Sequence, residues 1–143
     1  EFERYLRAVK LALVLEEWIN EKSENYILNR FGIAPGDLRN YVTNAEWLCY
    51  ALLEVMKIVK KPVKDLRKLL LRIRYGVREE LIELALLPGI GRVKARKLYN
   101  AGITIENVGK IPLTKLASLV GPKTAEKVKK YIQRKEKSSF LSY

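Results

Sequence analysis

The 143-residue chain contains no histidine and a single cysteine, Cys49. Without histidine there is no imidazole for general acid–base catalysis, for a Ser-His-Asp triad or for zinc binding. One cysteine excludes a disulfide within the chain and any multi-cysteine metal cluster. Long apolar runs are also missing, since none approaches the roughly 18 residues that span a bilayer, and no signal peptide is visible. These absences predict a non-catalytic, cytoplasmic protein that contacts no membrane.

Positive charge is what the chain has in excess, and this charge is concentrated in its second part. Lys and Arg number 28 against 16 Asp and Glu, so the net charge is +12. Residues 1–56 hold 6 basic and 9 acidic side chains, whereas residues 57–143 hold 22 and 7. Self-repulsion of this size is tolerable when a polyanion such as nucleic acid is the usual partner. The alternative is a solvated, Lys-rich surface of the kind that thermophilic proteins carry.

Apolar residues recur at helical spacing throughout the chain, and no stretch alternates with the period of a strand. The predicted fold is therefore all-α. We expect a helical-bundle segment over residues 1–75 and a compact unit of short helices over residues 76–135. The remaining residues, 136–143, are expected to form a flexible tail.

Capping residues mark the expected helix boundaries in the first segment. Ser23 is placed as the N-cap of a short helix that Gly32 ends. The sequence Ile-Ala-Pro-Gly-Asp at 33–37 then leads into a long helix over about 37–60, which Pro62 ends. Helical spacing predicts that this long helix buries Leu38, Val42, Ala45, Leu48, Leu52, Val55 and Val59. A further helix, rich in Leu and Arg, precedes Gly76.

The second part of the chain contains the same layout twice. Residues 80–99 and 113–131 each read as an apolar helix, a glycine-containing turn and a basic helix. The first turn is Leu-Pro-Gly-Ile-Gly at 87–91, and the second is Val-Gly-Pro-Lys at 120–123. This is the pattern of a paired helix-hairpin-helix unit.

The first hairpin has the composition of a phosphate-binding site. We expect its glycines to adopt backbone angles that a Cβ would oppose and to leave N–H groups bare at the start of the following helix. Such N–H groups and the helix dipole attract a phosphate oxygen, and nearby cations add salt-dependent contacts to the DNA backbone, without sequence preference. The apolar residue between the glycines should point inward and hold the two helices together. The predicted site consists of Gly89, Ile90, Gly91, Arg92, Lys94, Arg96 and Lys97.

The second hairpin predicts a weaker phosphate site, because Pro122 removes one N–H donor. Its candidate residues are Gly121, Lys123, Thr124 and Lys127. A structural role as the packed partner of the first hairpin is the alternative here, and the first hairpin itself could be a packing or protein-docking module. A nuclease or glycosylase is disfavoured, because it needs a catalytic carboxylate or lysine in a defined pocket, whereas the acidic residues after Gly76 are expected singly on solvated helix faces.

Two segments of the chain resemble a known family in the same order. Residues 76–102, with the first hairpin, closely resemble the C-terminal domain of archaeal superfamily-two DNA repair helicases of the Hjm type. Residues 31–39 and the sequence Ala-Glu-Trp-Leu at 45–48 resemble the helical domain that precedes it, so the resemblance covers roughly residues 5–135. It implies a piece of an ATP-dependent 3′–5′ helicase that acts at stalled replication forks and is associated with the nucleoid.

The family's long helix acts as a ratchet beside single-stranded DNA and stacks an aromatic side chain on a base. The resemblance assigns this stacking to Trp47, with Arg39 eight residues earlier on the same helix. Helical spacing alone instead favours a buried position for Trp47. Asn40 stands where the family often has a second basic residue, so the clamp at the first turn of this helix is expected to be weaker.

The resemblance also implies motor domains that use ATP and Mg²⁺ in the intact protein. No Gly-x-x-x-x-Gly-Lys-Ser/Thr motif occurs in this chain, so we expect it to hold no cofactor and to hydrolyse no ATP. The expected partners are single-stranded or forked DNA and the protein's own motor domains. Alternatively, the acidic first part or the tail docks a sliding clamp, a single-strand-binding protein or the motor. The end of the tail, Phe140–Tyr143, loosely resembles a clamp-binding peptide, with Lys137 in place of the usual Gln.

Overall fold

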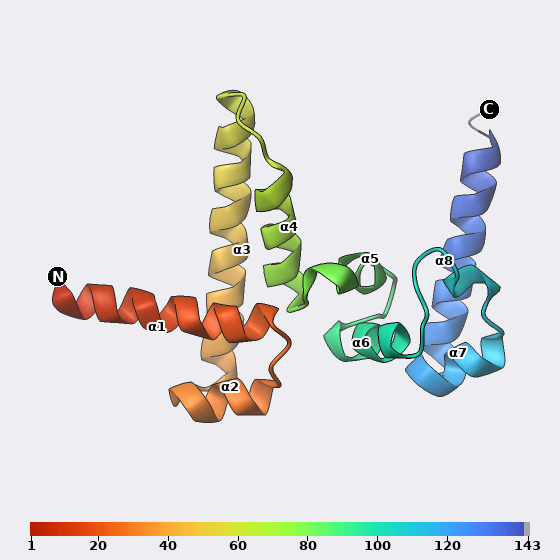
Figure 1. The fold of residues 1–143 in the computed structure, drawn as a ribbon, viewed down its shortest axis with the longest axis horizontal. Helices are drawn as coiled ribbons and strands as arrows, with labels where there is room; N and C mark the ends of the chain where they lie inside the picture. Colours follow the sequence, from red (N-terminus) through yellow and green to blue (C-terminus); the bar gives the residue numbers. More distant parts are fainter. Residues whose placement is uncertain (142–143) are drawn as a thin grey trace. The chain divides into compact units, whose positions relative to one another are not determined.

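The computed structural model describes residues 1–141 and contains only helices and their connections in this range (Figure 1). The all-α fold class predicted from the sequence is therefore confirmed. The chain divides into two compact units, Glu1–Glu79 and Glu80–Tyr143. This division falls a few residues after the boundary expected at residue 75.

The first unit consists of four helices, α1 (Phe2–Ile19), α2 (Glu24–Phe31), α3 (Pro35–Ile58) and α4 (Lys64–Tyr75). α4 runs back along α3, and α1 crosses α3 (Figure 1). The hydroxyl of Ser23 accepts the Tyr26 N–H at 3.2 Å at the start of α2, as its capping role predicts. α3 begins two residues earlier than expected, because Pro35 occupies its first turn and Asp37 accepts the Ala34 N–H at 2.9 Å.

A small apolar core joins the first three helices of this unit. Val14, Ile27 and Leu38 are buried, and half-buried aromatic and aliphatic side chains pack around them. The indole N–H of Trp18 donates to the Ile73 carbonyl at 2.8 Å and links the end of α1 to the end of α4. The helices are thus fixed where α1, α2 and the start of α3 meet.

One prediction for α3 is wrong in part. Leu38 is buried and Val42 and Ala45 are half-buried, but the four later members of the predicted buried face are exposed, namely Leu48, Leu52, Val55 and Val59. Helical spacing establishes that a face is apolar and does not establish what covers it. In this unit α4 packs along α3, and the buried Leu53 lies about 140° around the helix from the exposed Leu48.

The second unit consists of short helices and one long one, α8, which the expected unit of short helices did not include. A 3₁₀ turn, η1 (Glu79–Leu81), leads into α5 (Ile82–Ala85), which is followed by α6 (Arg92–Asn100), η2 (Val108–Lys110), α7 (Leu113–Val120) and α8 (Pro122–Leu141). α6 packs against α5 and α7, and α7 packs against α8. Leu81, Leu98, Ile103, Leu116 and Val128 are fully buried among these helices.

The end of the chain differs from the flexible tail expected over residues 136–143. α8 continues without a break to Leu141, because no glycine or proline stops it after Pro122. Phe140 and Leu141 lie on its last turn and are exposed. Ser142 and Tyr143, which complete the clamp-like sequence, lie outside the described residues.

Candidate nucleic-acid interface

The first hairpin connects α5 to α6 through a turn whose two glycines have different roles. Gly89 has φ +74°, a left-handed conformation that side chains other than glycine rarely adopt. A Cβ added there would lie 3.2 Å from the Thr124 methyl group, so the position is also close to α8. Ile90 is buried, as predicted, and anchors the turn in the core.

One prediction for Gly91 is wrong. It is the N-cap of α6 with φ −93°, a backbone conformation open to any residue, so the predicted need for glycine at this backbone angle is wrong. Its surroundings are open, since a Cβ there would meet no atom within 4 Å. Gly91 also carries no side chain that could cap the first turn of α6. The absent side chain therefore leaves the start of α6 accessible and uncapped from this position.

The four cations predicted for the first hairpin all lie on α6 but on two of its sides. Arg92 and Arg96 are one turn apart, and Lys97 lies about 100° further around the helix than Arg96. Lys97 is exposed, whereas Arg92, Lys94 and Arg96 are half-buried. The positive charge therefore surrounds the outer half of α6 and forms no single row.

Lys94 connects the two hairpins. Its ammonium group donates to the Thr124 hydroxyl at 3.0 Å, in a partly buried contact between α6 and the start of α8. The same Thr124 side chain approaches Gly89. The structure thus brings together two residues that were predicted for separate phosphate sites. Because thirty residues separate them, their contact could not be predicted from the sequence.

Arg96 also has partners within the second unit. Its guanidinium lies 2.9 Å from a carboxylate oxygen of Glu80 and 5.2 Å from the centre of the Tyr99 ring. The carboxylate partly neutralises this cation in the absence of any ligand. Sequence analysis did not single out Glu80 as a neighbour of the hairpin.

The second hairpin connects α7 to α8 through Gly121 and Pro122. Gly121 has φ +89° and Pro122 opens α8, so the first residue of this helix has no N–H group to donate. Lys123 and Lys127 are exposed on the first turns of α8, and Thr124 is turned toward the first hairpin.

Trp47 lies on the surface of the first unit and not in its core. It is 67 % exposed near the middle of α3, so the buried position that helical spacing alone favoured is wrong. Arg39 is exposed on the same helix, and eight residues correspond to two turns and about 80° more, so the two side chains share one half of the surface and no single line. Tyr50, one turn after Trp47, is exposed as well.

An ion pair fixes α3 beside α4 next to Trp47. The Arg74 guanidinium donates to the Glu46 carboxylate at 2.7 Å, and this hydrogen bond raises the pKa of Arg74 above its ordinary value. Glu46 precedes Trp47 and points to α4, so the indole projects about 100° around α3 from this ion pair and stays exposed.

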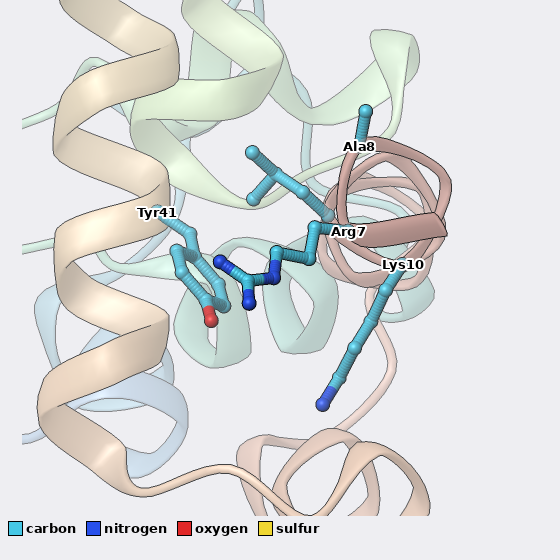
Figure 2. A pocket seen from close by; sticks show the side chains of 5 residues that line it. Arg7, Ala8, Lys10 and Tyr41 are labelled. Carbon is cyan, nitrogen blue, oxygen red and sulfur yellow. The ribbon is translucent and has the colours of Figure 1, made fainter. Parts of the chain in front are cut away.

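A basic hollow in the first unit was not anticipated from the sequence. It measures about 460 Å³ and is lined by Arg7, Ala8, Lys10 and Leu11 of α1 and by Tyr41 of α3 (Figure 2). The Arg7 side chain reaches toward the Tyr41 ring (Figure 2). Arg7 also lies 3.9 Å from the exposed Glu3 carboxylate, which partly offsets its charge.

Residues 1–141 contain neither a membrane-spanning helix nor a cluster of metal ligands. No helix in this range is long and apolar enough to cross a membrane. No group of three or more Cys, Asp or Glu side chains in the same range is arranged to hold a metal ion.

Comparison with known proteins supports the resemblance read from the sequence. The family model described as "Archaeal helicase, domain 4" matches residues 1–76. A protein named ATP-dependent DNA helicase Hel308 from Methanocaldococcus jannaschii is 48 % identical over 124 residues, which cover 86 % of this chain and 10 % of that protein. The protein of the same name from Pyrococcus abyssi is 41 % identical over 141 residues, or 94 % of this chain and 20 % of the relative.

The chain spans only a tenth to a fifth of the length of these relatives. Within that span the match extends over both units, because the Pyrococcus abyssi alignment includes nearly the whole chain. The chain therefore belongs to the archaeal superfamily-two DNA helicases and corresponds to a part of their C-terminal region.

Proposed function

We propose that this chain is the DNA-gripping part of an ATP-dependent 3′–5′ DNA helicase that acts in the repair of stalled replication forks. Its two units bind single-stranded or forked DNA, largely without sequence preference, while ATP and Mg²⁺ are used by motor domains elsewhere in the parent protein. The observation that carries the proposal is the surface of α6, where an uncapped helix start lies beside Lys94 and Lys97. DNA binding of this kind would place the protein at the nucleoid.

The arrangement around α6 favours contact with phosphates over contact with bases. The start of the helix is open at Gly91, and backbone N–H groups there can donate to an anion with help from the helix dipole. Cations on two sides of α6 match a charged strand that passes across the helix. None of these groups reads a base, which suits a protein that moves along DNA of any sequence.

The exposed indole of α3 supplies the second contact in this proposal. Trp47 presents an aromatic face on which a base can stack, and stacking tolerates every base. Arg39 lies earlier on α3 and provides a charge for the neighbouring phosphate. The first unit thus contacts bases and the second contacts the backbone.

The proposal is tested by fluorescence anisotropy of a labelled single strand titrated across salt concentration. The variant K94Q/K97Q removes two cations of α6, and Gln at position 94 retains a donor for Thr124. We expect the salt slope of the association constant to fall by about 1.4, because each cation that pairs with a phosphate of a single strand accounts for about 0.7.

The variant K61Q/K64Q is the matched control, because both lysines are exposed in the first unit and the change in charge is the same. A slope that falls equally in both variants would show that net charge alone attracts the strand. A slope that neither variant changes would contradict the proposed role of α6.

A protein-docking function is the second candidate, and one observation favours it. Four apolar side chains are exposed along a single face of α3 and its C-cap, namely Leu48, Leu52, Val55 and Val59. A contiguous apolar face on a folded protein is typical of an interaction surface. The motor domains of the parent protein are the proposed occupant, ahead of a sliding clamp or a single-strand-binding protein. Copurification of separately expressed motor domains with this chain, abolished in L48E/L52E, tests the assignment.

A further inference from the structure

α8 carries a row of positive charge that reaches well beyond the second hairpin. Five cations recur at steps of three or four residues on this helix, namely Lys123, Lys127, Lys130, Arg134 and Lys137. At about 100° per residue they fall within about 40° of one line along the helix. All five are exposed, and we call this row the α8 basic stripe.

The stripe lies on the side of α8 that faces away from the core. Ala125 and Val128 are buried and Ile132 is half-buried, and these residues share the opposite face of the helix. The side chain of Lys129, on the edge of that face, donates to the Gly109 carbonyl at 2.8 Å. The stripe is therefore fixed in direction by the packing of α8 on the rest of the second unit.

The stability of α8 does not account for this distribution of charge. Cations are disfavoured near the start of a helix, yet the first turn contains Lys123 and no acidic residue. Like charges one turn apart also repel each other. Within residues 1–141 no carboxylate forms an ion pair with any of the five cations, and only Glu126 lies at the edge of the stripe. A bound polyanion would relieve this repulsion.

The stripe begins where the two hairpins meet. Thr124, next to Lys123, accepts a hydrogen bond from Lys94 of α6 at 3.0 Å. Positive charge therefore continues from the first hairpin to the start of α8 and then along the helix for fourteen residues, or about 21 Å. A strand held at the hairpin meets the stripe without a gap in positive charge.

We infer that the α8 basic stripe binds the phosphate backbone of a nucleic acid strand and extends the contact made at the first hairpin. The inference rests on the proposed DNA-binding function. A protein partner fits the stripe poorly, because no apolar or aromatic residue interrupts it between Lys123 and Lys137 to anchor an interface. A membrane surface fits poorly as well, because the apolar face of α8 is covered by the core.

The variant K130Q/R134Q/K137Q tests the inference on the full chain. It removes the three cations furthest from the hairpin, and Gln keeps the helix propensity of these exposed positions. On a labelled single strand the salt slope should fall by about 2, from about 0.7 for each of the three cations, and affinity at low salt should fall roughly tenfold or more. Wild-type affinity should also keep rising with strand length after that of the variant has levelled off.

The variant K61Q/K64Q/R67Q carries the same loss of charge on exposed residues of the first unit and serves as the control. Equal effects of the two triple variants would overturn the inference. If K94Q/K97Q weakens binding and the α8 variant does not, the stripe is a solvated surface and the proposed function stands. If neither variant weakens binding, both are wrong. Tighter binding of poly-glutamate than of the oligonucleotide, abolished in the α8 variant, would assign the stripe to an acidic protein instead.

Discussion

The two units of the chain use their apolar residues in opposite ways. The first unit buries 7 apolar side chains and leaves 14 large ones exposed, whereas the shorter second unit buries 14 and exposes 6 in the part of the chain that the structure describes. A core of the second kind stabilises a domain without outside help, while a surface of the first kind calls for a covering partner. In the proposed function, the second unit binds DNA as a self-contained domain and the motor domains of the parent protein cover the exposed apolar side chains of the first.

The most direct test of this contrast measures the unfolding transition of each unit separately. Leu116→Ala removes a fully buried side chain from the second unit and should lower its free energy of unfolding by about 2–5 kcal/mol. Trp18 and Trp47 both lie in the first unit, so tryptophan fluorescence reports that unit alone, whereas circular dichroism reports the helices of both. In urea, the variant should shift the unfolding transition of the second unit, which circular dichroism detects and tryptophan fluorescence does not. The transition detected by fluorescence should stay in place.

The reciprocal variant is Ile27→Ala, which empties a buried position in the core of the first unit. It should shift the fluorescence transition and leave the other one in place. If either substitution moves both transitions together, the two units unfold as one and the contrast between them fails.

A second comparison sets Trp47 against a neighbour on α3. Trp47→Ala should weaken binding of a single strand by about 1–3 kcal/mol through the loss of base stacking. The free energy of unfolding should change by less than about 0.5 kcal/mol, because the indole is exposed. Leu48→Ala is the control, since Leu48 is exposed on another side of the same helix. Equal losses of affinity in the two variants would remove the stacking role.

A third comparison sets the two glycines of the first hairpin against each other, since one is expected to affect the stability of the second unit and the other its affinity for DNA. Gly89→Ala should destabilise the unit by about 1–2 kcal/mol, because of its left-handed φ, and the contact with Thr124 should add to the loss. Gly91→Ala should leave stability nearly unchanged, since its φ is ordinary and its surroundings are open. The methyl group of the second variant should instead hinder a phosphate at the start of α6. Thermal unfolding and anisotropy measured on both variants give the two readouts, and a stable Gly89→Ala would refute the assignment.

The smallest expected effect concerns the acidic neighbour of Arg96. Glu80→Gln keeps the shape of the side chain and removes the charge that faces the guanidinium at 2.9 Å. Exposed ion pairs of this kind contribute at most about 1 kcal/mol, so DNA affinity should rise by no more than a few-fold at low salt. The gain should vanish at high salt, where charges are screened. A loss of affinity would show that Glu80 positions Arg96 for DNA and does not compete with it.

Much of the fold is predictable from residues that act locally. Ser23, Gly32 and Gly76 marked helix ends correctly, because capping depends on neighbours in sequence. The exposed face of α3 was missed because periodicity carries no information about what covers Leu48 or Leu52. The extension of α8 beyond residue 135 is not predictable from composition, because a charged, polar end is compatible with a helix as well as with a flexible tail.

The candidate site was predictable in composition and less so in arrangement. The turn from 87 to 91 identified the hairpin, since glycine and an apolar residue at fixed spacing are local signals. The contacts of Lys94 with Thr124 and of Arg96 with Glu80 join residues far apart in sequence and depend on how the hairpins pack. The sequence analysis did not identify the α8 basic stripe, although its cations recur every three or four residues, because only the position of the core shows that this face is outward.

The central claim is that the chain binds a single strand through phosphates in its second unit and a stacked base in its first. One salt titration of a labelled single strand tests it, with anisotropy and tryptophan fluorescence followed together in the wild type and in W47F. We predict binding that weakens steeply with salt in both proteins and fluorescence quenching that is far larger in the wild type. No rise in anisotropy at low salt would contradict DNA binding by this chain, and equal quenching in the two proteins would contradict the role of Trp47.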